Sequence, residues 1–155
     1  MKVQTDTGRL QKEAGRENFR PSFFVALDMF LGSLNPRSRA IVEARYGVHT
    51  GTPKTLEEIG REYRITRERV RQVIGSAFRI LRAMQTLAHI AEIHRVIQST
   101  LSERSGIMKA EELFSLLASD DTKERGSLLV FLDCFPSTVD ERVTEEWENL
   151  WRLSL

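Results

Sequence analysis

Residues 55–73, "TLEEIGREYRITRERVRQV", carry the pattern of two short amphipathic helices joined by a tight turn. Thr55 begins the first helix with a capping box, because Glu58 follows three residues later and can return a hydrogen bond to the cap. Thr66 is a second candidate N-cap, directly ahead of a longer helical pattern. Gly60 is a small residue that lets the second helix cross the first closely. The stretch therefore predicts a helix-turn-helix.

The second helix of this pair has one apolar face and one polar face. The apolar side chains recur at helical spacing and are Val70, Val73, Ile74, Ala77 and Leu81. The polar stripe, rotated away from them, contains Glu68, Arg71, Gln72, Gly75 and Arg79. A solvated helix with intrahelical pairs such as Glu68–Arg71 would carry the same residues, so the polar stripe alone leaves two interpretations open.

The second interpretation is recognition of DNA. In a helix-turn-helix, the N-terminal residues of the second helix reach base edges in the major groove. Arginine can read guanine, glutamine can read adenine and glutamate can accept from cytosine. The base-reading candidates are therefore Arg67, Glu68, Arg71 and Gln72. The helix N-termini at Thr55 and Thr66 can also offer backbone N–H groups to phosphates.

Helical patterns flank this pair on both sides. The apolar spacing of residues 23–34 predicts a helix after Pro21 and Ser22, and Asn35 followed by Pro36 starts the next helix, which should stop at Gly47. Downstream, the pattern through residues 87–101 is either an extension of the preceding helix or a new helix after a kink near residues 84–88.

Two further helices are expected through residues 109–119 and 124–135. Residues 137–155 fit either a two-stranded hairpin or a last helix, and the alternation of apolar residues favours the hairpin. Three helices followed by a hairpin would make a winged-helix domain. The expected fold class is mostly α, a helix-turn-helix domain followed by a small helical domain of this winged kind.

Charge divides the chain of 155 residues, whose formal net charge is only +1. Residues 1–104 hold 18 Lys and Arg against 11 Asp and Glu, whereas residues 105–155 hold 5 against 11. Only the first part is expected to meet a polyanion. The predicted organisation is a flexible tail (1–20), a DNA-binding domain (21–85) and an acidic domain (86–155) that binds a protein partner or self-associates. A stabilising cap on the first domain is the alternative role for residues 86–155.

Several function classes find no support in the sequence. Cys134 is the only cysteine, so an intramolecular disulfide is excluded, and it has no evident base partner for catalysis. His89 and His94 flank Glu92, but five residues separate them and they point to different helix faces, so no metal site is expected. No apolar run approaches the roughly 20 residues that span a bilayer, and the N-terminus lacks the apolar core of a signal peptide. We expect a cytoplasmic, nucleoid-associated protein without enzymatic activity or cofactor.

Two stretches of the sequence resemble the same protein family, and both match it in the same register. "LNPRSRAIVEARYGV" (34–48) and the helix-turn-helix stretch resemble region 4 of bacterial sigma-70-type initiation factors, over about residues 34–82. The resemblance implies binding of double-stranded promoter DNA at the −35 element, with the same four base-reading residues. It implies backbone contacts from Arg37, Thr55, Thr66, Arg69 and Arg79. It also implies docking on the beta flap of RNA polymerase, for which the apolar candidates are Phe24, Leu27, Leu31 and Ile41.

The chain departs from the family pattern at Ile74, Gly75 and Ser76, where acidic, small and basic residues are usual, so one phosphate-contacting lysine is missing. Nothing resembles the aromatic region that melts promoter DNA, and we do not expect this chain to open a promoter alone. Two other functions stay open: a polymerase-docking or antitermination-type interaction module, and the DNA-targeting subunit of a DNA-processing system.

Overall fold

The computed structural model describes residues 21–118, 120–135, 139–142 and 150–153, the last two ranges by their backbone. Seven helices and three short strands lie within these residues, so the mostly α prediction is confirmed. The predicted tail, residues 1–20, lies outside the described residues. None of the described helices combines the length and the apolar character that crossing a bilayer requires.

The first four helices are α2 (Phe23–Leu31), α3 (Pro36–Tyr46), α4 (Leu56–Tyr63) and α5 (Arg67–Ala83). The N-caps of α3, α4 and α5 and the C-cap of α3 are the predicted ones. The Asn35 side chain accepts from the Ser38 N–H ahead of Pro36, and Gly47 ends α3 in the left-handed conformation at φ 62°. Only glycine adopts this region without a steric cost, which is why α3 stops there.

The remaining elements are α6 (Ala88–Ser102), β1 (Ile107–Lys109), α7 (Ala110–Leu117), α8 (Thr122–Cys134), β2 (Val139–Arg142) and β3 (Leu150–Leu153). A new helix, α6, therefore follows a turn after α5. Strands β2 and β3 pair antiparallel, with Val139 opposite Leu153, which confirms the hairpin over the last helix. Strand β1 joins the other edge of β3 and gives the order β1-β3-β2. Assignment of this part to the winged-helix class stays a prediction.

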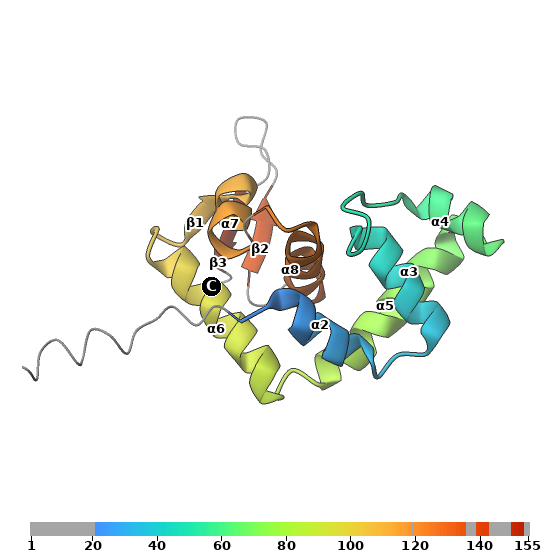
Figure 1. Cartoon of the computed structure of the whole chain (residues 1–155), viewed down its shortest axis with the longest axis horizontal. Coiled ribbons are helices and arrows are strands. Elements are labelled where there is room, and N and C mark those ends of the chain that lie inside the picture. Colours follow the sequence, from blue (N-terminus) through green and yellow to red (C-terminus); the bar gives the residue numbers. More distant parts are fainter. Residues whose placement is uncertain (1–20, 119, 136–138, 143–149, 154–155) are drawn as a thin grey trace, which may run out of the picture.

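Two apolar clusters hold the helices together. The larger one joins side chains of α2, α5, α6, α7 and α8, so residues on both sides of position 85 share one core. The smaller one centres on Ile41, Ile59 and Val70 and fixes α4 and α5 on α3. Figure 1 shows α2 and α8 between the helix-turn-helix helices and the β-sheet.

Helix α8 is the element that closes the larger core. The Phe131 ring stacks on Phe30 with centroids 5.8 Å apart, and Gly126 passes so close to Val48 that a Cβ there would lie 2.8 Å from its Cα. Polar contacts surround this apolar packing: the Tyr46 hydroxyl donates to Asp133 at 2.7 Å, and the Arg82 guanidinium donates to the Cys134 carbonyl at 2.6 Å. The C-terminal part is thus packed directly on the helix-turn-helix part.

Candidate nucleic-acid interface

Side-chain caps set where α4 and α5 begin. The Thr55 hydroxyl accepts from the Glu58 N–H at 3.2 Å, and Glu58 accepts from the Thr55 N–H at 2.7 Å, which completes the predicted capping box. That backbone hydrogen bond, with the Thr55 hydroxyl, lowers the pKa of Glu58. The Thr66 hydroxyl accepts from the Arg69 N–H at 3.1 Å. Both threonine side chains therefore serve as caps, and what α4 and α5 offer to a phosphate is the backbone N–H groups of their first turns.

The turn between the two helices is tight because of two backbone features. Gly60 lies so close to the turn that a Cβ would approach the Ile65 carbonyl oxygen to 2.7 Å, and its own carbonyl accepts from the Ile65 N–H at 2.9 Å. Arg64 ends α4 in the left-handed conformation, at φ 55° and ψ 46°. The sequence predicted that Gly60 lets the second helix cross the first closely. In the structure, the backbone that lies closest to Gly60 is that of the turn.

Packing decides which face of α5 is left for a ligand. Val70, Ala77 and Leu81 are buried, together with Phe78, which extends the predicted apolar stripe. Because this face is fixed against the two cores, α5 cannot rotate about its axis without exposing it. The polar stripe is consequently held outward along the same helix.

The four base-reading candidates all lie on this outward face. Arg67, Glu68, Arg71 and Gln72 are all exposed. Arg71 donates twice to the Glu68 carboxylate, from Nε at 2.9 Å and from Nη2 at 2.8 Å, and Gln72 donates to it at 3.4 Å. The hydrogen bond from Arg71 lowers the pKa of Glu68, and the same bond raises the pKa of Arg71. The group is charged and ordered, and because it is exposed its members can exchange these partners for base edges.

The backbone-contact candidates make short local contacts. Arg37 donates to the Tyr63 carbonyl at 3.1 Å and ties the start of α3 to the end of α4. Arg69 donates to Gln72 at 3.3 Å, and Arg79 donates to the Ser76 hydroxyl at 2.8 Å. All three arginines are exposed, so each keeps nitrogens for a phosphate.

Three of the four apolar candidates for polymerase docking are buried as core residues. Leu27 and Leu31 are 1% exposed and Ile41 is 0% exposed. The first two lie in the cluster closed by α8, and Ile41 lies in the smaller cluster. Phe24 is half-buried at the edge of the larger core. The apolar side chains that α2 does expose are Val25 and Met29, at 56% and 60%.

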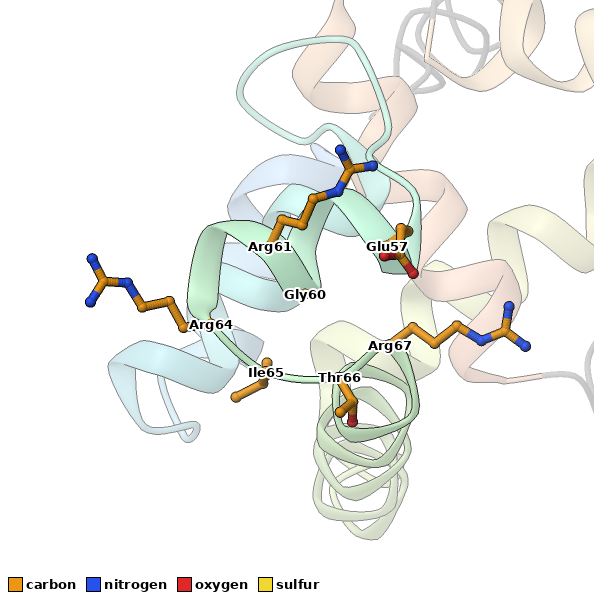
Figure 2. Close-up of a pocket in the computed structure, with 7 residues that line it drawn as sticks. All are labelled: Glu57, Gly60, Arg61, Arg64, Ile65, Thr66 and Arg67. Carbon is orange, nitrogen blue, oxygen red and sulfur yellow. The ribbon is translucent and has the colours of Figure 1, made fainter.

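Sequence analysis did not identify two arginines of this region as candidate site residues. Arg61 and Arg64 line a groove of about 490 Å³ at the turn, together with Arg67. Figure 2 shows the three side chains around the turn, with Arg61 from α4, Arg64 from its end and Arg67 from the start of α5. Their charge was visible in the sequence, but their grouping depends on the left-handed backbone at Arg64.

Groups associated with catalysis or metal binding stand apart from this interface. No cluster of three or more His, Cys, Asp or Glu residues suited to a metal ion occurs in the described part of the chain. Cys134 is fully buried, and burial raises the pKa of its thiol to about 12, so the thiolate that a nucleophile needs is not available.

Comparison with known proteins shows what the helix-turn-helix part of the chain is similar to. Residues 30–83 match the family described as "Sigma-70, region 4". The sigma factor SigA of Nostoc sp. is 50% identical over 56 residues, which are 36% of this chain and 14% of that protein. SigA1 of Synechococcus elongatus is 48% identical over 56 residues, with the same coverage. HrdD of Streptomyces coelicolor is 47% identical over 47 residues, covering 30% of this chain. The chain thus spans about 14% of the length of these relatives.

Proposed function

We propose that the chain, whose residues 30–83 match the family described as "Sigma-70, region 4", binds double-stranded promoter DNA and acts with RNA polymerase in transcription initiation. The observation that carries the proposal is the outward face of α5. Four side chains that can read bases are exposed together near its N-terminus, while its opposite face is locked into the cores. This is the arrangement by which a recognition helix enters the major groove.

Specificity for a DNA sequence would arise because the side chains on this face exchange their hydrogen-bond partners within α5 for base edges. In the major groove, Arg71 leaves the Glu68 carboxylate and donates to a guanine, Glu68 accepts from a cytosine, and Gln72 reads an adenine. Arg67, which stands at the start of α5, is the fourth reader. The expected target is an element of the −35 type, which is what the resemblance to sigma-70 region 4 implies. The matched relatives are named RNA polymerase sigma factors.

Affinity would come from the sugar-phosphate backbone. Arg37, Arg69 and Arg79 each keep donors for phosphates, and the first N–H groups of α4 and α5 add uncharged contacts. Because such contacts release counterions, binding should weaken steeply as salt rises. The protein would act where bacterial polymerase and DNA meet, in the cytoplasm at the nucleoid.

A second candidate function is docking on RNA polymerase, with DNA contact secondary. The observation that favours it is the exposed apolar pair Val25 and Met29, one turn apart on α2. Under this function the partner would cover α2 from outside, without displacing α8 from Leu27 and Leu31.

Replacement of Arg71 by alanine tests base reading. Arg71→Ala should weaken binding to a −35-type duplex by roughly 5- to 150-fold and relax the preference over a scrambled duplex, since it removes one bidentate base contact. Fluorescence anisotropy with both duplexes measures this. The matched control is Arg95→Ala, because Arg95 makes the same kind of pair with Glu92 on α6, through bonds of 2.9 and 2.5 Å.

An unchanged sequence preference in Arg71→Ala would remove this residue from the base-reading set. If neither the wild type nor the variant prefers the promoter-like duplex, yet both co-purify with polymerase, the docking function replaces the DNA-reading one.

A further inference from the structure

Three neighbouring arginines differ from every other arginine between residues 21 and 135 of the described chain. Ten of the thirteen donate their guanidinium groups to a carboxylate, a carbonyl, a hydroxyl or an amide oxygen. Arg61, Arg64 and Arg67 have no such side-chain partner among the described residues, and all three are exposed. The described arginines whose guanidinium groups have no hydrogen-bond partner therefore lie together at one place, the turn of the helix-turn-helix.

The acidic residues around the turn compensate this charge only in part. The pKa of Glu58 is lowered first by the hydrogen bonds with Thr55 and less by the charge of Arg61, and the pKa of Glu68 is lowered first by the hydrogen bond from Arg71 and less by the charge of Arg67. Glu58 is engaged in the capping box with Thr55, and Glu62 pairs with Lys54 at 2.6 Å. Glu57 is the only acid that lines the groove, against the three arginines. The groove therefore carries a net positive charge and is complementary to an anionic ligand.

The shape of the site indicates an extended ligand. Figure 2 shows that the three guanidinium groups point in different directions around the turn instead of converging on one point. A small anion could meet only one of them, whereas a chain of phosphates can meet several in succession. Gly60 and Ile65 line the groove between the arginines.

The groove is also continuous with the base-reading face. A second groove of about 370 Å³ lies between the starts of α4 and α5 and is lined by Thr55, Leu56, Glu57, Arg67, Glu68 and Arg71. Glu57 and Arg67 line both grooves. A ligand whose bases reach Arg71 and Glu68 can therefore continue past Arg67 to the turn.

We propose that this groove holds one strand's sugar-phosphate backbone beside the bases read by α5, with Arg61 and Arg64 as phosphate contacts. The inference rests on the proposed DNA binding and adds two contacts outside the part of α5 that meets the bases. DNA is favoured over an acidic protein segment because the groove continues into the base-reading face. Since phosphates are present in every sequence, Arg61 and Arg64 contribute affinity without sequence preference.

The test is the salt dependence of binding by the full chain. The double variant Arg61→Gln/Arg64→Asn removes both cations, and asparagine tolerates the left-handed backbone at position 64. The control is Arg95→Gln/Arg104→Gln, which removes the same charge from exposed pairs with Glu92 and Glu112. Anisotropy is measured with a −35-type and a scrambled duplex across a salt series, and circular dichroism checks that each variant is folded.

The slope of log K against log salt should become shallower by about 1.8 in the groove variant, at about 0.9 for each lost phosphate. Both duplexes should weaken equally, and the control should keep the wild-type slope. An unchanged slope, or a loss confined to the promoter-like duplex, would overturn the proposal. So would unchanged DNA binding with loss of polymerase co-purification, which would assign the groove to an acidic protein surface.

Different results would contradict the base-reading proposal and the groove proposal. A wild type that binds both duplexes equally, and whose groove variant still loses slope, contradicts base reading and supports the groove. A wild type that prefers the promoter-like duplex, with a groove variant that behaves like the control, supports base reading and overturns the groove. Absence of binding to either duplex would contradict both.

Discussion

Glu68 accepts hydrogen bonds from two of the proposed DNA-reading side chains. It accepts from Arg71 and from Gln72, so these side chains are ordered along the outer face of α5. The spacing of these residues fits both a solvated helix face with intrahelical pairs and a recognition helix. The structure contains the intrahelical pairs that the first interpretation predicts. The two interpretations are compatible, because an exposed pair is weak enough to be replaced by base contacts.

His94 allows a residue-scale prediction about pH. Its Nε2 is buried without a hydrogen-bond partner among the described residues, and its ring stands edge-on to Phe135, with centroids 4.5 Å apart. Burial lowers the pKa of His94 below the ordinary value of 6.5. The unfolded chain therefore binds this proton more readily than the native protein, so the free energy of unfolding should fall as pH drops below about 6.5.

Urea unfolding at about pH 7.5 and 5.5 measures this contribution. His94→Gln, which is neutral at both pH values, should lose less stability between them than the wild type does. His89→Gln is the matched control, since His89 is an exposed histidine on the same helix, and it should behave like the wild type. An equal pH dependence in wild type and His94→Gln would show that His94 titrates normally in the native state.

At the scale of elements, local chemistry in the sequence determined most helix boundaries. Asn35-Pro36, Thr55 with Glu58, and Thr66 each predicted a helix start that the structure confirms. These signals are reliable because a cap satisfies N–H groups within its own helix and needs no distant partner. The base-reading residues could be named from the sequence for the same reason, although their role stays a prediction.

Features that depend on distant partners could not be read in this way. Strand β1 was not predicted, because its three residues pair with β3 more than forty positions along the chain. The left-handed Arg64 gave no signal either, since glycine or asparagine is usual at such a position. The packing of Leu27 and Leu31 against α8 could not be read from local sequence either, because that helix lies about a hundred residues away.

At the scale of the whole molecule, the larger of the two apolar clusters crosses the predicted domain boundary at residues 85 and 86. Helix α8 from the acidic part covers α2 and contacts α3 and α5. This packing accords with the expectation of a stabilising cap, one of the two roles considered for residues 86–155. Binding to a protein partner or to a second copy remains a prediction for the surface that this packing leaves exposed.

Glu124 connects the two parts and gives a prediction at this scale. Its carboxylate, in the first turn of α8, accepts from the Phe23 N–H at 2.6 Å and the Phe24 N–H at 3.3 Å, and also from the Ser22 hydroxyl. It thus satisfies the N-terminus of α2 from a distant helix. Glu124→Ala should lower the free energy of unfolding by about 1–3 kcal/mol, because it leaves these N–H groups without their acceptor.

Chemical denaturation of the full chain tests the role of Glu124. Glu103→Ala, at an exposed glutamate that ends α6, should change stability by less than about 0.5 kcal/mol. Equal effects of the two substitutions would show that the hydrogen bonds from the start of α2 to Glu124 do not contribute to stability.

The central claim is that α5 reads bases. The most direct measurement is the anisotropy of wild-type binding to a −35-type duplex and to a scrambled duplex of equal length, across a salt series. The claim predicts tighter binding to the promoter-like duplex at every salt concentration, with log K falling by about 0.9 per phosphate contact. Equal affinity for the two duplexes would contradict it.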